Sequence, residues 1–474
     1  MRHNIYLIIL LFCSFAQGDP LQDTLKDLDW SQAISFYAKD ITHNKVIIDF
    51  HGSRSQPPAS TLKLITATLA LTNLGPNYQF KTSLNAYGKI KKSKLDGFIE
   101  ITFGGDPKFS RFTLRKWFKQ LKKSGISTIK GNINLIDPPS INPPGRLSNE
   151  LNDCYGRMPS SASIDQNCSI IKVEGTQQNV LANLVTNTRT EGLINNQVTS
   201  TRHCRYQGDE PSAHLIFHDK TAILNLYQDN KAITLTGCIH PKHFPVQVTI
   251  APPKNSFLKN QILDALKRNN MTLQGNIRII PKPLGTQKQA ILHKQQKSMP
   301  VKTLLKRLLL NSDNHIAEAL YYGSTQNKIK QPYWLNAEKN AKTTLKTLGL
   351  NFSNAAILDG SGLSRYNHIQ TKQMVQLLEV IYKSPKLRPY ILKYLPASGR
   401  TGTLSYRFRH PNLRNIIQAK TGTLKDVLGL SGYLTHQQRI IAFSMALDGN
   451  KNSYGLYMSK ENKLFNNLLN RISS

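Results

Sequence analysis

Segments with the pattern of β-strands lie at both ends of this chain, and this placement limits the folds that it can adopt. Residues 33–40 and 45–50 predict a hairpin, because two strand-like runs flank the short polar turn 41–44. Further strand-like runs close the chain at residues 416–421, 427–434 and 439–447. Helical segments lie between the two groups. We therefore expect a domain of the α/β (α+β) class that both chain ends build together around an insertion.

The middle of the chain, from about residue 80 to residue 290, has a different pattern of short strands, turns and a few helices. Within it, residues 131–136 (GNINLI) resemble residues 275–280 (GNIRII). Two similar turn-and-strand units on either side of a middle region predict an inserted domain that is itself interrupted by a further insert.

A serine and a lysine lie three positions apart directly after the Gly-, Ser- and Pro-rich loop 51–59. Residues 60–70 lack Gly and Pro and contain Ala and Leu, which predicts a largely buried helix. Ser60 and Lys63 then share one helix face. A partly desolvated amine can accept the proton of a serine hydroxyl and make it a nucleophile. Alone, the S-x-x-K pattern is a weak signal, because it occurs by chance in many chains, often as a helix N-cap followed by a solvated lysine.

A second motif, Ser312-Asp313-Asn314, lies between the predicted helices 301–310 and 315–322. Ser312 could relay protons between lysines and a leaving amine, and Asn314 could donate to a substrate carbonyl. The alternative is a simple helix N-cap, since Ser, Asp and Asn all favour that position.

A third motif, Lys420-Thr421-Gly422-Thr423, follows a predicted strand. A strand edge can pair with a peptide, and Gly422 would let the substrate approach the backbone. Lys420 and the two threonines suit a terminal carboxylate. The N–H groups of Thr423 and Ser60 could form an oxyanion hole. The alternative is an ordinary turn between strands.

The three motifs in this order are typical of penicillin-binding proteins and serine β-lactamases. The separation of Ser60 from Ser312 is far longer than a compact β-lactamase needs. The chain therefore resembles the class C low-molecular-mass penicillin-binding proteins, a family of D-Ala-D-Ala carboxypeptidases and endopeptidases. Other segments similar to this family are residues 104–107 (GGDP), 143–145 (PPG), 155–162 (YGRMPSSA) and 359–365 (DGSGLSR).

The resemblance implies a transpeptidase-like catalytic domain with two nested, strand-rich inserted domains. The expected bounds are 19–82 with 290–474 for the catalytic domain, 83–165 with 252–289 for inserted domain II, and 166–251 for inserted domain III.

The resemblance also implies the chemistry of the site. Ser60 would be acylated by the penultimate D-Ala carbonyl of a peptidoglycan stem peptide, or by a β-lactam, with Lys63 as the base. Ser312 and Lys420 would assist proton transfer to the leaving amine. No metal or organic cofactor is implied. Two alternatives stay open: a serine β-lactamase, and a non-catalytic basic protein that binds the cell wall.

The chain departs from the family pattern near the expected substrate site. Arg146 stands where a tryptophan is expected, and Arg157 and Met158 interrupt the YGAP-like stretch. Asp153 lies where the family can place an acidic group facing a side-chain amine of the substrate. It could equally be a surface turn residue beside a disulfide.

The N-terminus has the pattern of a secretory signal peptide over residues 1–18. Arg2 and His3 precede an apolar run over residues 5–15, and Ala16-Gln17-Gly18 supplies small residues for cleavage. A lipid anchor on Cys13 is disfavoured because the bulky Phe12 precedes it. We therefore expect a periplasmic protein, soluble or peripherally associated with the membrane.

Four cysteines follow the predicted signal peptide, namely Cys154, Cys168, Cys204 and Cys238. An even number in an oxidising compartment indicates disulfides, and three pairings are possible. We expect the two sequence-local pairs, 154–168 and 204–238. Four free thiols are the alternative, and a zinc site is disfavoured because the ligand spacing is wrong.

The charge is strongly positive, with 62 Lys and Arg residues against 28 Asp and Glu residues, a net charge of +34. Such a field attracts polyanions. Since the compartment disfavours nucleic acid, we expect a salt-sensitive association with anionic polymers of the wall or membrane surface. The alternative is a general compositional bias without function.

Overall fold

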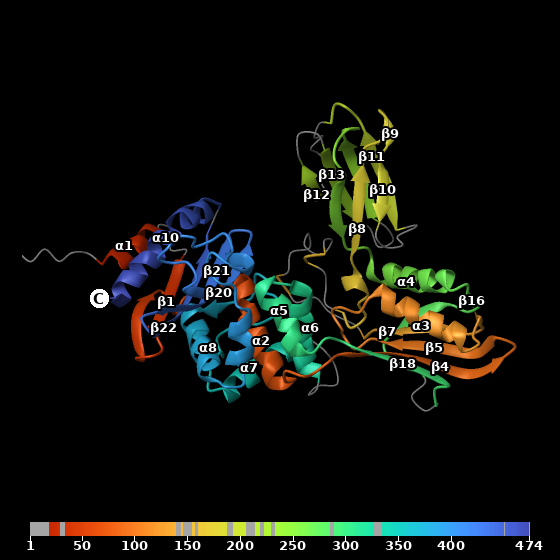
Figure 1. The fold of residues 1–474 in the computed structure, drawn as a ribbon, viewed down its shortest axis with the longest axis horizontal. Coiled ribbons are helices and arrows are strands. Elements are labelled where there is room, and N and C mark those ends of the chain that lie inside the picture. The colour runs from red at the N-terminus through yellow and green to blue at the C-terminus, as the bar shows by residue number, and fades with distance from the viewer. Residues whose placement is uncertain are drawn as a thin grey trace, which may run out of the picture.

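The computed structural model describes residues 19–28, 34–138, 144–145, 154–156, 160–186, 193–204, 214–218, 222–228, 233–284, 289–326, 334–449 and 451–473. The predicted signal peptide 1–18 and Asp153 lie outside these ranges. Figure 1 shows three lobes, each built around its own sheet or pair of sheets. None of the helices within these ranges is long and apolar enough to cross a membrane.

The first lobe contains an antiparallel five-stranded sheet made from both ends of the chain, in the order β2-β1-β22-β21-β20. Ile34 in β1 pairs with Leu447 in β22. The expected α/β class and the joining of the two chain ends are therefore confirmed. The strands are β1 (Ile34–Asp40), β2 (Lys45–Phe50), β20 (Ile417–Leu424), β21 (Val427–His436) and β22 (Arg439–Asp448).

Helices cover both faces of this sheet, because successive side chains in a strand point to opposite sides. Phe36 and Ala38 pack in the core beneath α1 (Pro20–Leu28) and α10 (Lys451–Ser473). Tyr37, between them, packs in the core of the other helices. Those are α2 (Lys63–Asn73), α5 (Val301–Leu310), α6 (Asn314–Gln326), α7 (Trp334–Thr347), α8 (Thr371–Lys383) and α9 (Arg388–Ile391).

Short elements complete the first lobe. The strands β3 (Ser55–Gln56) and β19 (Ile369–Gln370) form a small two-stranded sheet. The 3₁₀ helices η1 (Ala59–Leu62), η4 (Leu392–Tyr394) and η5 (Gly402–Leu404) lie at turns of the chain.

The second lobe is a seven-stranded sheet with α3 (Arg111–Lys123) and α4 (Lys254–Arg268) packed on one face (Figure 1). The two similar segments noted in the sequence lie side by side here, since Ile133 in β7 pairs with Ile277 in β17 in a parallel register. The strands are β4 (Lys81–Lys91), β5 (Lys94–Thr102), β6 (Thr128–Ile129), β7 (Ile133–Ile136), β16 (Thr272–Leu273), β17 (Ile277–Ile280) and β18 (Leu292–Lys297).

The similarity extends beyond those strands. The order α3-β6-β7 recurs as α4-β16-β17, and β6 pairs with β16 just as β7 pairs with β17. The second lobe therefore contains a repeated helix-strand-strand unit, and the strands of the third lobe lie between the two copies in the chain.

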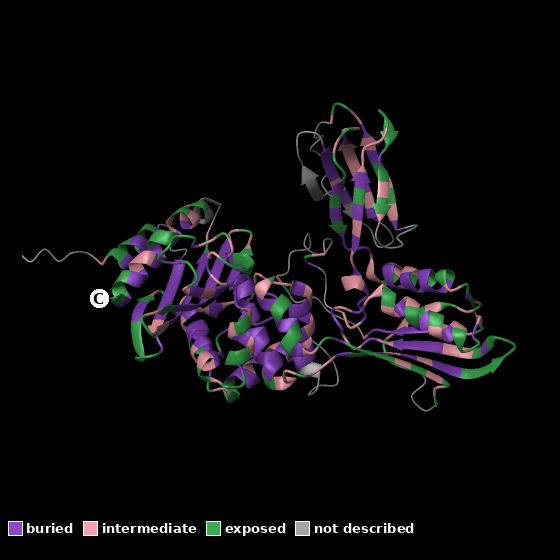
Figure 2. Ribbon diagram, in the orientation of Figure 1, coloured by how far each residue is buried: buried purple, intermediate pink, exposed green. Residues whose placement is uncertain are grey.

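The third lobe consists of a three-stranded and a five-stranded sheet. The two sheets share an apolar core, and Figure 2 shows buried residues along their strands. Its strands are β8 (Ser169–Glu174), β9 (Val180–Leu181), β10 (Asn183–Thr186), β11 (Ile194–Ser200), β12 (His214–His218), β13 (Ala222–Gln228), β14 (Ile233–Ile239) and β15 (Val246–Ile250). The short helix η3 (Asp165–Asn167) precedes them. The division of the chain at residues 82, 165, 251 and 289 stays a proposal. The strands β8 to β15 fall within residues 166–251, whereas β18 (Leu292–Lys297) pairs with β4 and extends the sheet of the second lobe past residue 289.

The four cysteines form the two sequence-local disulfides. Cys154 bonds to Cys168, and Cys204 bonds to Cys238. The expected pairing is confirmed, and the alternative of four free thiols is wrong.

Candidate active site

Ser60 and Lys63 meet at the start of α2. The sequence predicts one continuous helix from residue 60, but Ser60 lies in the 3₁₀ turn η1 and the α-helix begins at Lys63. The Lys63 Nζ donates to Ser60 Oγ over 2.7 Å. Ala59, just before the serine, has a φ of 45°, which a residue with a Cβ adopts only at a cost. The backbone is therefore strained where it presents the hydroxyl.

The Lys63 side chain is fully buried, and three acceptors surround its amine. Besides Ser60 Oγ, these are Asn314 Oδ1 at 2.7 Å and the Ser361 carbonyl at 2.9 Å. An ammonium has three N–H donors, and burial without acceptors would be strongly unfavourable. The site is thus built to hold this amine against the serine hydroxyl.

Asn314 connects the second motif to the first. Its Oδ1 accepts from Lys63, and its Nδ2 donates to the Tyr155 carbonyl over 3.2 Å. The N-cap alternative also holds in part, because Asp313 Oδ1 accepts from the Ile316 N–H at 3.0 Å. Asp313 therefore caps α6 while Asn314 faces the lysine.

Ser312 and Lys420 form a second serine–lysine pair. Lys420 Nζ donates to Ser312 Oγ over 2.9 Å and to the Thr421 carbonyl over 2.7 Å. Burial, together with the nearby charge of Lys63, lowers the pKa of Lys420 well below its ordinary value. A lysine that gives up its proton easily can act in proton transfer.

The third motif lies on β20, the edge strand of the five-stranded sheet in the first lobe. A Cβ on Gly422 would lie 2.9 Å from the Ser60 nitrogen, so the glycine lets this strand pass close to the serine backbone. The sequence predicts a different role for this glycine, namely the approach of substrate to the backbone. Thr421 Oγ1 donates to Thr403 Oγ1 over 2.7 Å, and Thr423 is exposed.

Sequence reasoning missed the part played by residues 359–365, which it used only as a family resemblance. The Ser361 carbonyl accepts from Lys63 and, at 3.4 Å, from the Ser60 hydroxyl. A Cβ on Gly362 would overlap the Ala59 carbonyl oxygen. Glu318 accepts from the Gly360 N–H and the Ser361 hydroxyl. The two glycines in this motif were the available signal, since Gly often marks a close backbone approach.

Residues from the inserted chain also reach the site. Lys108 Nζ lies 3.2 Å from Asp313 Oδ2, and Ser163 Oγ lies 3.0 Å from His315 Nε2. Burial alone would raise the pKa of Asp313, but Lys108 and the Ile316 N–H hold it below its ordinary value. The loop with Ser312 is thus held from both lobes.

The described part of the chain contains no group of three or more His, Cys, Asp or Glu side chains placed to hold a metal ion. Asp153, the remaining candidate residue, lies outside the described ranges, so the structure places the other eight and not this one.

A buried lysine on a serine hydroxyl, a second lysine–serine pair and an adjacent strand edge define the class of active-site-serine enzymes. Comparison with known proteins identifies the family. The model of the D-Ala-D-Ala carboxypeptidase 3 (S13) family matches residues 19–466. The chain belongs to this family, and it is a serine peptidase of the class C low-molecular-mass penicillin-binding protein type.

Individual relatives agree with this assignment. The chain is 29% identical over 441 residues to the D-alanyl-D-alanine carboxypeptidase DacB of Haemophilus influenzae, covering 90% of this chain and 88% of that protein. The crystal structure of penicillin binding protein 4 from Haemophilus influenzae aligns with a TM-score of 0.80 at 28% identity, covering 94% and 99% of the two chains. A structure of that protein complexed with a β-lactam aligns with a TM-score of 0.76 at 27% identity, with the same coverage.

Proposed function

We propose that this protein is an exported D-alanyl-D-alanine carboxypeptidase or D,D-endopeptidase that cleaves peptidoglycan stem peptides through an acyl-enzyme on Ser60. The observation that carries the proposal is the 2.7 Å hydrogen bond from Lys63 to Ser60 in a chain of this family. The relatives are named as carboxypeptidases and as a penicillin-binding protein.

Acylation requires the neutral form of Lys63, whose amine lone pair then accepts the proton of Ser60 Oγ. The serine oxygen attacks the penultimate D-Ala carbonyl carbon, and the carbonyl oxygen becomes an oxyanion. The N–H groups of Ser60 and Thr423 stabilise it. The close passage of Gly422 beside the Ser60 nitrogen supports this pairing, because it brings β20 to the serine backbone.

The C–N bond then breaks, and the leaving amine takes a proton through Ser312 and Lys420. The terminal carboxylate of the substrate binds beside Lys420, Thr421 and Thr423. A carboxylate there would restore the charged form of Lys420, which the free site disfavours. Water finally attacks the acyl-enzyme ester with Lys63 again as the base, releasing the shortened peptide and the free serine.

Substituting Ser60→Ala tests the proposal. We expect wild-type protein to release D-Ala from a D-Ala-D-Ala peptide and to form a covalent β-lactam adduct on Ser60 by mass spectrometry. Ser60→Ala should lose both, whereas the exposed control Ser124→Ala should keep both. D-Ala release at the wild-type rate by Ser60→Ala would refute the mechanism.

The rate of β-lactam turnover separates a penicillin-binding protein from a β-lactamase. With nitrocefin we expect one stoichiometric burst followed by a stall, because the acyl-enzyme deacylates slowly. Sustained hydrolysis would favour a β-lactamase. Digestion of cross-linked peptidoglycan with product analysis then ranks the endopeptidase activity against the carboxypeptidase activity.

Export and surface attraction complete the proposal. The pattern of residues 1–18 supports secretion into the periplasm, and the net charge of +34 supports association with anionic wall or membrane polymers. Binding to isolated sacculi should weaken as the salt concentration rises from about 50 to about 500 mM, because dissolved ions shorten the range of the electrostatic attraction. Binding that is insensitive to salt would count against the charge having this role.

A further inference from the structure

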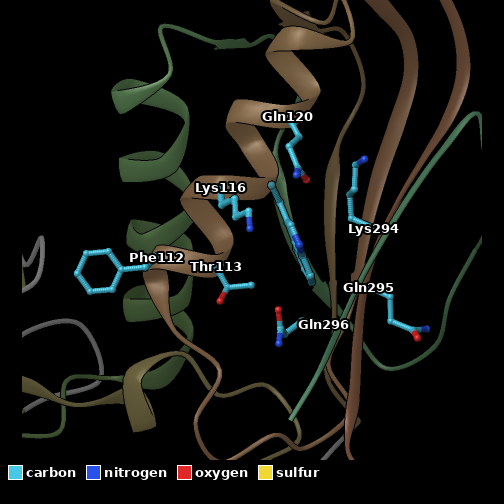
Figure 3. Close-up of a pocket in the computed structure, with 8 residues that line it drawn as sticks. Phe112, Thr113, Lys116, Gln120, Lys294, Gln295 and Gln296 are labelled. Carbon is cyan, nitrogen blue, oxygen red and sulfur yellow. The ribbon is translucent and has the colours of Figure 1, made fainter. Parts of the chain in front are cut away.

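A polar cavity of about 400 Å³ lies in the second lobe, between helix α3 and the edge strand β18. Its size falls within the usual range for ligand sites. Thr113, Lys116 and Gln120 of α3 and Gln296 of β18 project into the space between the two elements, whereas Phe112 projects away from it (Figure 3). Trp117, Lys294 and Gln295 complete the lining.

The strand side of this cavity is polar because of the register of β18. Leu292 packs against the apolar core under α3. Lys294 and Gln296 follow at two-residue intervals and therefore face the same side. Helix α3 and strand β18 thus each line the cavity with polar side chains, and the lining includes no acidic residue.

The side chains of the lining define what can bind there. Gln120 and Gln296 each offer amide donors and an acceptor, and the two lysines offer donors only. Such a set suits a ligand with many hydroxyl and acetamido groups and a negative charge. An apolar ligand does not fit, because a site for such a ligand is lined mostly by apolar side chains. Stacked bases do not fit either, because Trp117 is only 4% exposed and Phe112 projects away from the space between the two elements.

The cavity lies in the lobe that contacts the candidate active site. Lys108 contacts Asp313, next to Ser312, and α3 begins three residues after Lys108.

We propose that this cavity binds the glycan strand of peptidoglycan, an N-acetylated saccharide that bears carboxylates, while the stem peptide reaches Ser60. The proposal rests on the proposed function. It assigns to the second lobe the recognition of the polymer rather than of the scissile bond.

Binding is measured by calorimetry with full-length Ser60→Ala protein and a peptide-free oligosaccharide of alternating N-acetylglucosamine and N-acetylmuramic acid. We expect saturable binding that Lys116→Met and Gln296→Leu each weaken at least fivefold. Lys119→Met is the matched control, because Lys119 is an exposed lysine of the same helix that does not line the cavity. It should bind as the unmodified protein does.

Activity separates this proposal from the proposed function. These measurements use protein that retains Ser60. Its Lys116→Met variant should release D-Ala from a sugar-free peptide at the wild-type rate. On glycan-linked peptide, the KM of the same variant should be at least fivefold higher. Failure of wild-type protein on the sugar-free peptide would refute the proposed function alone. The glycan site is overturned by no binding at millimolar glycan, by an equal effect of Lys119→Met, or by equally tight binding of polyphosphate.

Discussion

The first lobe, which contains the candidate active site, and the second lobe differ in where they place lysine side chains. In the first, Lys63 and Lys420 are fully buried, each held by hydrogen bonds to serine and carbonyl oxygens. In the second, Lys116 and Lys119 stand exposed on α3. Burying an ammonium costs several kcal/mol per ion unless acceptors surround it. Within the described residues, the two fully buried lysines are those to which the proposed mechanism assigns proton transfer, whereas Lys116 and Lys119 contribute charge at the surface.

The largest effect is expected at the buried lysine beside the serine. Lys63→Arg keeps the positive charge but cannot act as a base, because arginine does not deprotonate in proteins. We expect the rate of acylation by a β-lactam to fall by about 100- to 10,000-fold. Lys119→Arg, the same change on the exposed helix, should leave the rate unchanged. A Lys63→Arg protein that acylates at half the wild-type rate would show that the buried lysine is not needed as a base, and would contradict the expected difference between the two lobes.

Two glycines with similar φ angles give the next test. Gly362 has a φ of 84° and an added Cβ would overlap the Ala59 carbonyl oxygen, whereas Gly349 has a φ of 78° and nothing within 4 Å. Gly349→Ala should therefore lower the free energy of unfolding by only about 1 kcal/mol. Gly362→Ala should lower it by more than about 3 kcal/mol or displace Ser60, because backbone must move. Denaturant unfolding and β-lactam acylation measure both, and equal losses would contradict the expectation.

The contact between the lobes should have a moderate effect. Lys108→Met removes the partner of Asp313, and we expect acylation to slow by about tenfold because the Ser312 loop loses its position. The acid limb of the pH profile should move to higher pH, because burial then raises the pKa of Asp313. Lys108→Arg should restore both.

The control for this contact is an exposed ion pair of the same lobe. Lys130 lies 3.9 Å from Asp96, with side chains 46% and 63% exposed. Such pairs contribute little, so Lys130→Met should change neither rate nor pH profile. If Lys108→Met behaves in the same way, the inserted chain does not position the site.

The smallest effect is a change in how stability depends on pH. The pKa of Lys420 lies well below its ordinary value in the folded protein, so the unfolded state holds a proton that the folded state has lost. Stability should therefore rise with pH between that lowered pKa and about 10.4, by at most about 1.4 kcal/mol per pH unit. Lys420→Met should lose this part of the slope. Unchanged slopes in denaturant unfolding between pH 7 and 10 would show that Lys420 stays charged.

The sequence was sufficient for features that depend on spacing or local pattern. The three-residue interval predicts the contact of Ser60 with Lys63, and the similar segments around residues 133 and 277 predict a nested insertion. The local pairing of the cysteines also follows from proximity along the chain. These features need no knowledge of how distant segments meet.

Contacts between distant segments could not be predicted in the same way. The Ser361 carbonyl reaches Lys63, and Lys108 reaches Asp313, only because the fold brings separate loops together. The 3₁₀ turn at Ser60 was missed because Ala and Leu favour an α-helix, while the close approach of Gly362 and Gly422 to the turn depends on tertiary packing.

The pairing of Ile34 with Leu447 governs when the enzyme can first act. A chain emerges N-terminus first, so β1 and β2 are made long before β22, their sheet partner. The strands of the second and third lobes lie within residues 81–297 and can complete their sheets earlier. Because β20 belongs to the sheet whose last strand is made near the C-terminus, a nascent or truncated chain can have a complete insert and no assembled candidate site. Activity is thereby postponed until nearly the whole polypeptide has been delivered.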